Sequence, residues 1–321
     1  MGGLVDQLNA KNVGGPAKVA ILLGTYNGQQ YLAEQLDSFA IQTHDNWAVW
    51  ASDDGSSDAT RTILEGYQSK WPAGRLSLLS GPKAGFEANF LALICNKNIE
   101  ADYYAYSDQD DIWEAEKLER AVHWLKSVPS DMPALYCGRT RLVDGDNKEI
   151  GLSPLFSRPP CFANALIQSI AGGNTMVFNQ AARALMQVAG QQCSIITHDW
   201  WTYMVVTGCG GKVFYDEVPT LRYRQHGANV IGMNDGWRAR FKRLGMQWQG
   251  RFRIWNNVHI EALGRLDSRL TAENREILRQ FVAARKMSLL PRLFNLNRSG
   301  VHRQTRLGNI GLLAAAIFNK V

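Results

Sequence analysis

Residues 18–42 read KVAILLGTYNGQQYLAEQLDSFAIQ and join two patterns in one short stretch. The apolar run 18–24 has the length and composition of a buried strand. The residues after Gly28 carry apolar side chains at helical spacing, which indicates a helix. A strand that leads through a polar, glycine-containing loop into a helix is the first part of a βαβ unit. The stretch therefore predicts an α/β fold with a parallel sheet.

The same alternation continues along the first half of the chain, which strengthens the prediction of βαβ units. The polar clusters fall at the ends of predicted strands, and ligands of parallel sheets bind at the carboxyl ends of the strands. These clusters are therefore the candidate site residues. The later part of the chain contains further strand candidates with less regular spacing. Strands are predicted at 18–24, 47–52, 75–80, 102–107, 134–144, 174–179 and 212–224, and helices at 28–42, 57–70, 86–98 and 114–126.

Three carboxylates, Asp108, Asp110 and Asp111, lie within four positions at the end of the strand predicted at 102–107. Like charges this close raise one another's pKa unless a cation lies between them. Asp108 and Asp110 are two positions apart, so in extended backbone they point the same way. Carboxylates without a histidine or thiolate beside them suit Mg²⁺ or Mn²⁺, with water and diphosphate oxygens as the remaining ligands. The alternative is a solvated acidic loop that caps the next helix.

Two further polar clusters follow the first and second predicted strands. Asp53 and Asp54 end the second strand, and their carboxylates could accept hydrogen bonds from a nucleobase or a ribose. The alternative is turn chemistry followed by a helix cap. After the first strand, the loop 25–28 offers backbone N–H groups at the start of a helix to an anionic or polar ligand. Both loops are candidate nucleotide contacts.

The second half of the chain contains candidate acid–base and phosphate-binding groups. The segment THDWW, 197–201, sets Asp199 against aromatic side chains, which can raise the pKa of a carboxyl and suit it to general-base catalysis. The alternative for Asp199 is a helix N-cap. In RYRQHGANVIG, 222–232, Arg222, Arg224 and His226 could bind phosphate oxygens or complete a metal shell, although a histidine after a strand can also be structural.

Taken in order, these motifs resemble the inverting family-two glycosyltransferases, and especially bacterial rhamnosyltransferase-like members. The resemblance runs from Lys18 to Gly232 and is carried by ILLGTYNGQQYLAEQLDSF, SDDGSSDAT, YSDQDDIWEAEKLE, AGGNTMVFN, THDWW and YRQHGANVIG. It implies a GT-A fold, that is, a Rossmann-like, mixed but mainly parallel sheet flanked by helices. It also implies metal-dependent, inverting transfer of a hexosyl group, with rhamnose as one candidate, from a nucleotide-diphosphate sugar. The implied acceptor is a hydroxyl of a cell-surface glycan or lipid-linked molecule, as in polysaccharide or lipopolysaccharide biosynthesis, and the implied cofactor is Mn²⁺ or Mg²⁺.

The resemblance also assigns roles to individual positions. Asp199 matches the catalytic base, which in many members follows a glutamate and here follows His198. Asp108 and Asp110 match a metal-binding D-x-D, and His226 matches a late histidine that binds metal or diphosphate. The implied nucleotide contacts are Thr25, Tyr26, Asn27, Asp53, Asp54, Lys83 and Asp108. The implied sugar or acceptor contacts are Gly173, Asn174, Trp113, His198, Trp200 and Arg224.

Trp113 and Lys117 match a family extension of the D-x-D with the pattern D-D-x-W-x-x-x-K. Trp113 either stacks on a sugar or only packs inside the protein. The sequence itself leaves this choice open.

Acidic and basic residues are unevenly distributed along the chain. Residues 237–321 contain 17 Lys and Arg against 4 Asp and Glu, whereas residues 1–236 contain 18 against 25. We predict a flexible leader at 1–17, a catalytic domain at 18–236 and a basic amphipathic helical extension at 237–321. Apolar side chains at Phe241, Leu244, Trp248 and Phe252 would line one helical face, which suits an anionic membrane surface. The alternative is a helical appendage packed on the catalytic domain.

Several other classes of protein do not fit. Five cysteines without a C-x-x-C pair indicate free thiols in a reducing cytosol. The first 17 residues lack the pattern of a signal peptide, and the longest apolar run, 310–318, is shorter than the roughly 20 residues that span a bilayer. The first loop lacks G-x-G-x-x-G, which disfavours a dinucleotide oxidoreductase. The acidic body has no nucleic-acid-binding module. A cytoplasmic protein, peripheral on the inner face of the membrane, is expected, with a non-catalytic sugar-nucleotide-binding or scaffold protein as the alternative function.

Overall fold

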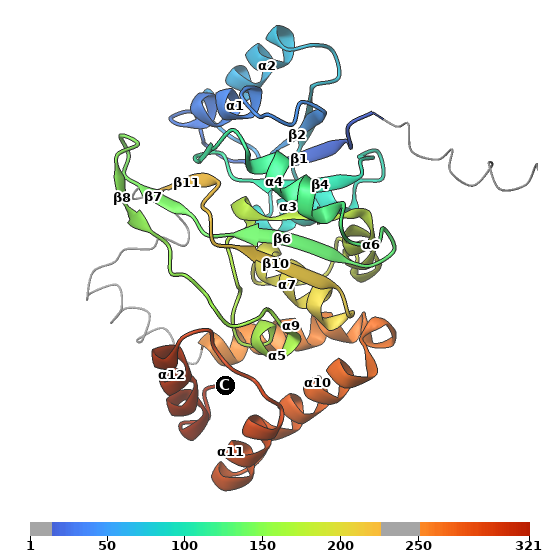
Figure 1. Cartoon of the computed structure of the whole chain (residues 1–321), viewed down its shortest axis with the longest axis vertical. Helices are drawn as coiled ribbons and strands as arrows, with labels where there is room; N and C mark the ends of the chain where they lie inside the picture. Colours follow the sequence, from blue (N-terminus) through green and yellow to red (C-terminus); the bar gives the residue numbers. More distant parts are fainter. Residues whose placement is uncertain (1–14, 226–250) are drawn as a thin grey trace, which may run out of the picture.

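The computed structural model of the chain describes residues 15–225 and 251–321. A seven-stranded sheet lies at its centre, with helices on both faces (Figure 1). The strand order is β10-β6-β9-β4-β1-β2-β3, so the chain builds outward in both directions from β1. The strands are β1 (Val19–Thr25), β2 (Trp47–Asp53), β3 (Leu76–Ser80), β4 (Tyr103–Ser107), β6 (Ala134–Gly138), β9 (Val177–Asn179) and β10 (Lys212–Asp216).

The predicted parallel core is confirmed. Strand β1 pairs in parallel with β2 and β4, and β2 pairs in parallel with β3. Strand β9 runs antiparallel to both β4 and β6, which makes the sheet mixed. In this register Thr25 lies opposite Asp53, so the first two polar loops leave the sheet side by side.

Alternation along β1 explains why helices cover both faces. Val19, Ile21 and Leu23 belong to one apolar core, and Ala20 and Leu22 belong to the other. Because successive side chains of a strand point to opposite faces, a continuous apolar run needs a cover on each side. The first face is covered by α1 (Leu32–Ala40), α2 (Thr60–Lys70) and α4 (Lys117–Leu125), and the second by α3 (Phe86–Cys95), α5 (Phe162–Ala165), α6 (Gln180–Ala189) and α7 (His198–Gly208).

A second, four-stranded sheet has the order β5-β11-β7-β8. Its strands are β5 (Ile112–Trp113), β7 (Arg141–Val143), β8 (Glu149–Leu152) and β11 (Leu221–Arg224). The sequence did not predict this sheet, because strands of two to four residues show no usable periodicity. The pairing of Leu221 with Trp113 brings the end of β11 next to the acid-rich loop after β4.

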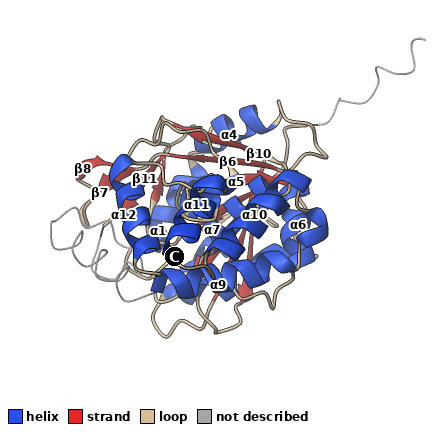
Figure 2. Ribbon diagram, turned by 90° about the horizontal axis from the view of Figure 1, so that it is seen from below, coloured by secondary structure: helices blue, strands red, loops and turns tan. Residues whose placement is uncertain are grey.

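The chain after residue 250 is helical, as predicted, and helices gather at one end of the molecule (Figures 1 and 2). Phe252, Leu263 and Phe281 are buried in the same core as α6 and α7, and Asn274 donates hydrogen bonds to the carbonyls of Thr207 and Gly208. At least this part of the extension therefore packs on the catalytic body. The helices are α9 (Arg251–Gly264), α10 (Ala272–Ala284), α11 (Leu289–Arg298) and α12 (Arg306–Ile317), with 3₁₀ turns at Gly173–Thr175 and Asp267–Arg269.

Some predictions fall outside the described residues. These include most of the leader, the boundary at residues 236 and 237, and the apolar positions 241, 244 and 248. In the part of the chain that is described, no helix is long and apolar enough to cross a bilayer. All five cysteines are free thiols, as expected.

Candidate active site

The loops after β1 and β4 are fastened together by one side chain. The Gln109 Oε1 accepts a hydrogen bond from the Tyr26 N–H at 2.8 Å, and its Nε2 donates to the Tyr26 carbonyl at 2.9 Å. A Cβ at Gly28 would lie 2.3 Å from Gln109 Oε1, so any larger residue at position 28 would displace the Gln109 amide. Sequence analysis missed Gln109, because the middle residue of D-x-D gives no local signal of such a contact.

The two acidic side chains at the end of β2 have different partners. The Asp53 Oδ1 accepts from Ser56 Oγ at 2.5 Å and from Thr25 Oγ1 at 3.3 Å. Asp54 accepts from the backbone N–H groups of Lys83 at 2.6 Å and Gly85 at 3.0 Å. These contacts are the turn hydrogen bonds that sequence analysis gave as the alternative to ligand contact. They hold Asp53 beside the loop that carries Thr25 and Tyr26.

Asp108 lies where three carboxylates converge. Burial, together with the charges of Asp110 and Asp199, raises the pKa of Asp108 to about 7. Asp199 is 91 positions away in sequence, so its electrostatic influence shows that the fold brings the two loops together. Such a cluster of oxygen donors is stabilised by a cation among them.

The third carboxylate of the cluster, Asp111, points into the protein. Its Oδ2 accepts a hydrogen bond from Asn174 Nδ2 at 2.6 Å, and Lys117 Nζ donates to the Asn174 carbonyl at 2.8 Å. The Lys117 ammonium also lies 4.6 Å from the ring centroid of Trp113. Burial raises the pKa of Asp111 and lowers that of Lys117 to about 7. We call Asp111, Trp113, Lys117 and Asn174 the buried brace.

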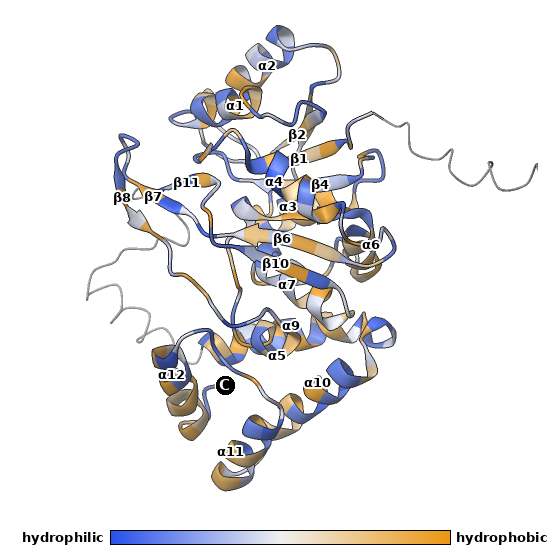
Figure 3. Cartoon of the chain, viewed as in Figure 1, coloured by the Kyte–Doolittle hydropathy of each residue, from blue (hydrophilic) through white to orange (hydrophobic). Residues whose placement is uncertain are grey.

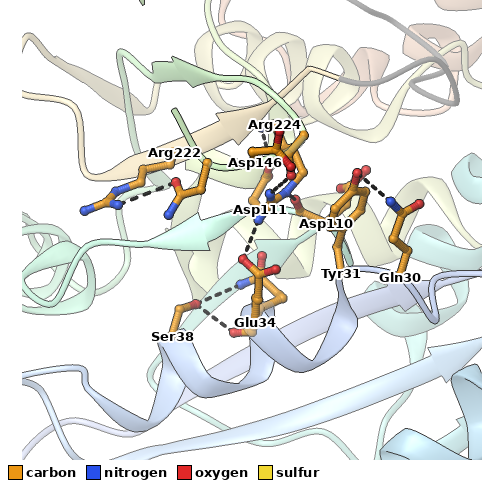
Figure 4. A network of polar contacts seen from close by, with 12 residues as sticks. Gln30, Tyr31, Glu34, Ser38, Asp110, Asp111, Asp146, Arg222 and Arg224 are labelled. Atoms are coloured by element: carbon orange, nitrogen blue, oxygen red, sulfur yellow. Dashed lines mark hydrogen bonds and ion pairs between the residues drawn. The ribbon is translucent and has the colours of Figure 1, made fainter. Parts of the chain in front are cut away.

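Arg224 holds the backbone of the D-x-D loop. Its guanidinium donates from Nε to the Asp110 carbonyl at 3.1 Å and from Nη2 to Glu34 at 2.7 Å. The guanidinium carbon lies 4.3 Å from the ring centroid of Tyr31. Figure 4 shows Glu34 and Tyr31 rising from α1 toward Arg224, with Asp110 and Asp111 beside them. The N-terminal end of α1, β11 and the D-x-D loop thus form one polar network.

Asp199 lies in the first turn of α7, and Thr197 is the residue in the N-cap position. The Asp199 carboxylate accepts from the backbone N–H of Trp200 at 2.7 Å and is also hydrogen-bonded by Thr197 and the Gly173 N–H. Burial nevertheless raises the pKa of Asp199. A half-buried carboxyl with a raised pKa, close to Asp108, has the environment expected of a general base.

The structure contradicts direct ligand contact for three aromatic side chains. Trp113 is 1% exposed, with its ring 4.6 Å from that of Phe39, so it packs and does not stack on a sugar. Trp200 is buried and donates to the Ala165 carbonyl. His198 is also buried, with its ring stacked on Phe90.

The predicted sugar or acceptor contacts of two polar residues, Asn174 and Arg224, are also corrected. The Asn174 amide binds Asp111, and the Arg224 guanidinium binds Asp110, Gly145 and Glu34. Both side chains are buried and occupied by protein groups, so they position the site and do not reach for a sugar. Gly173 remains beside Asp199, Tyr26 is exposed, and His226 lies outside the described residues.

Helix α9 supports the segment that carries Asp199. His259 is buried, its Nε2 accepts from the Ile196 N–H at 3.3 Å, and its ring lies 4.5 Å from that of Trp200. Burial lowers the pKa of His259 to about 3. His259 is therefore a positioning residue for the loop before α7, and its neutral form is the one that the fold accommodates.

A His259→Gln variant is expected to be less sensitive to acid than the wild type. Below about pH 6.5 the unfolded chain protonates His259 whereas the folded chain does not, so stability falls as the pH decreases toward about 3. This histidine contributes a slope of about 1.4 kcal/mol per pH unit, which glutamine removes while keeping an acceptor for Ile196. Urea unfolding at several pH values measures the slope. His123→Gln, at an exposed position on α4, is the control, and an unchanged slope in His259→Gln would refute the assignment.

A separate shallow cavity of about 570 Å³ lies beside the small sheet. Glu114, Arg141 and Arg222 line it and form ion pairs with one another. Arg222, one of the predicted phosphate-binding residues, lines this cavity, and its guanidinium is paired with Glu114.

No group of three or more His, Cys, Asp or Glu side chains within residues 15–225 and 251–321 is arranged to hold a metal ion. The predicted set of Asp108, Asp110 and His226 includes a residue outside those ranges. The carboxylates of Asp110 and Asp199 lie close enough to Asp108 to raise its pKa, and carboxylate oxygens are the ligands that Mg²⁺ and Mn²⁺ prefer.

Comparison with known proteins gives a family match and similar folds. The family model described as Glycosyl transferase family 2 matches residues 20–188. A curated relative, the dTDP-rhamnosyl transferase RfbG of Shigella flexneri, is 31% identical over 234 residues, which are 70% of this chain and 78% of the relative.

Two solved structures share the fold at low identity. Staphylococcus aureus TarS 1–349, in complex with UDP-GlcNAc, superposes with a TM-score of 0.53 at 16% identity, covering 88% of this chain and 90% of TarS 1–349. The mannosyltransferase PcManGT of Pyrobaculum calidifontis, in complex with GDP-Man and Mn²⁺, gives a TM-score of 0.50 at 15% identity, covering 95% and 86%. These likenesses confirm the predicted GT-A architecture.

Proposed function

This chain belongs to glycosyl transferase family 2, and we propose that it is a metal-dependent, inverting enzyme that uses a nucleotide-diphosphate sugar. The observation that carries the proposal is the convergence of Asp108, Asp110 and Asp199 at the carboxyl edge of the sheet, beside Asp53. A nucleotide site, a cation site and a base within one region are the parts that glycosyl transfer requires.

The donor would bind across the loops after β1, β2 and β4. The exposed ring of Tyr26 and the side chains of Thr25, Asn27, Asp53 and Lys83 are the proposed nucleotide contacts, together with Asp108. Asp54 would act through the backbone of residues 83–85, which it already holds. The 31% identical rhamnosyl transferase supports dTDP-rhamnose as the first donor to test, and UDP- and GDP-sugars remain candidates.

Asp108, Asp110 and His226 would hold Mn²⁺ or Mg²⁺, with Asp110 as the most direct ligand. The cation would neutralise the leaving diphosphate, a Lewis-acid contribution of several kcal/mol. The protein's own contribution is to keep the Asp110 backbone in place through Arg224, and Asp111 turned inward through Asn174.

Asp199 would act as the general base. It would accept the proton of the acceptor hydroxyl while that oxygen forms a bond to the anomeric carbon and the bond to the diphosphate oxygen breaks. Attack from the face opposite the leaving group inverts the anomeric centre. The raised pKa of Asp199 brings the base closer to the pKa range that is effective near neutral pH.

The proposed acceptor is a hydroxyl of a glycan or lipid-linked molecule, in polysaccharide or lipopolysaccharide biosynthesis. We propose that the enzyme works in the cytoplasm, peripheral on the anionic inner face of the membrane, and that nucleic acid is not a partner. The excess of basic residues after position 236 supports this placement.

A thermal-shift screen of nucleotide sugars with Mn²⁺ tests the donor class. A donor present at a hundred times its Kd is expected to stabilise the folded chain by about 2.7 kcal/mol, and so to raise its Tm. Free rhamnose and Mn²⁺ alone are the controls. If no dTDP-, UDP- or GDP-sugar raises the Tm, the proposed donor class is wrong.

A further inference from the structure

Helices α11 and α12 expose large apolar side chains on the surface of the described chain. On α11, Leu290 and Phe294 are 76% and 66% exposed and lie one helical turn apart. On α12, Leu307 and Ile310 are 72% and 64% exposed and lie three positions apart. We define the apolar face as these four side chains together with Leu289, Leu313 and Ile317, which are also exposed.

The two helices form a single unit at one end of the molecule. The buried Arg292 of α11 donates a hydrogen bond to the Ala316 carbonyl of α12 at 2.9 Å. Leu296 and Leu312 anchor the inner sides of the helices in the core. Figure 1 shows both helices at the end of the molecule that lies farthest from α2, and Figure 3 shows hydrophobic colouring on both.

Basic residues predominate in the part of the chain that carries the apolar face, although Glu276 on α10 interacts with Arg298. Residues 277–321 contain eight Lys and Arg and no Asp or Glu. Lys286, Arg298 and Arg306 are exposed beside the ends of α11 and α12. A surface that combines exposed apolar side chains with cations is complementary to a bilayer that contains anionic lipid.

We propose that the apolar face of α11 and α12 docks on an anionic lipid surface, with the apolar side chains entering the headgroup–acyl boundary. A second copy of this chain fits less well, because a two-fold interface would set the face against itself and bring like charges together. Neither helix reaches the roughly 20 residues needed to span a bilayer, so the helices would lie on the surface.

This proposal adds a membrane-binding surface to the proposed function. It rests on the proposed function only in taking the acceptor to be held at a membrane. It places the contact on α11 and α12, within the extension at 237–321 for which sequence analysis already expected contact with an anionic membrane surface. Lipid binding needs no sugar transfer, so the two proposals can fail separately.

Vesicle sedimentation of the full chain tests the face. The wild type is expected to bind vesicles that contain phosphatidylglycerol, to bind vesicles of phosphatidylcholine alone more weakly, and to be released by salt. The double variant Leu290→Glu/Phe294→Glu should bind anionic vesicles at least about tenfold more weakly, because two apolar side chains are lost and two negative charges are gained.

Ile41→Glu/Val188→Glu is the matched control, since Ile41 at the C-cap of α1 and Val188 in α6 are exposed apolar residues, and both helices lie away from the face. It should bind like the wild type, and circular dichroism should show that both double variants are folded. Equal binding of the Leu290/Phe294 variant and the wild type would overturn the proposal. The proposal would also be overturned if the wild type did not bind anionic vesicles, or if light scattering showed that it dimerises through these residues. Donor turnover with a soluble acceptor, measured without vesicles, shows separately whether the transferase proposal holds.

Discussion

An Asp199→Asn variant is expected to lose about 10²- to 10⁴-fold in kcat while it still binds the nucleotide sugar. Asparagine has nearly the shape of aspartate and can still accept from the Trp200 N–H, but it cannot take a proton from the acceptor hydroxyl. Steady-state kinetics with a suitable acceptor measures the loss, and calorimetry with the donor measures binding. Because the change affects a proton transfer and spares the nucleotide loops, kcat and donor Kd should respond differently.

The control for Asp199→Asn is Asp267→Asn, which removes an exposed carboxylate on the 3₁₀ turn Asp267–Arg269. It should leave both kcat and donor binding at the wild-type level. Near-normal kcat in Asp199→Asn would exclude this side chain as the base. If the wild-type protein binds donors but transfers sugar to no acceptor, the non-catalytic sugar-nucleotide-binding protein becomes the better description.

An Asp110→Asn variant is expected to lose the part of donor affinity that depends on Mn²⁺. Replacing outer-shell partners of a metal commonly costs 10- to 100-fold in affinity, so loss of a direct ligand should cost about a hundredfold or more. Calorimetric titration of the nucleotide sugar with Mn²⁺, and again with a chelator, gives the comparison. The wild type should lose affinity on chelation, whereas the variant should be weak under both conditions.

Asp146→Asn is the matched control, because Asp146 is an exposed carboxylate that lies beside the same polar network in Figure 4. It changes the local charge equally and should keep the dependence on Mn²⁺. If Asp110→Asn binds donor as the wild type does, with the same response to Mn²⁺, the cation site has been assigned to the wrong residues.

Much of the sheet could be predicted because its signal is local. The residues at 19–23 are all apolar, as in a strand covered on both faces, and the observed β1 spans Val19–Thr25. The strand predicted at 174–179 contains β9 (Val177–Asn179), whereas the small sheet was missed. The strands of the small sheet have two to four residues, too few to show an alternation, and their pairing depends on partners far away in the chain.

Sequence analysis identified the acidic residues of the candidate site. It assigned the wrong contacts to several aromatic and polar residues around them. Asp53, Asp108 and Asp199 could be proposed because each follows a strand or begins a helix, and their catalytic roles stay predictions. A tryptophan after an acidic pair looks the same in sequence whether it meets a sugar or Phe39. Likewise, the contact between Asp111 and Asn174 joins positions 63 apart, so only tertiary packing reveals that Asn174 holds Asp111.

The close approach of Gly28 to Gln109 limits how this enzyme can diverge. A methyl group at position 28 would collide with the amide, and a shorter residue at position 109 would leave the Tyr26 main chain without two of its hydrogen bonds. A substitution at either position alone would loosen the loop that is proposed to hold the nucleotide. Related chains that have lost the glycine should also have lost the glutamine, so the two positions should vary together over evolutionary time.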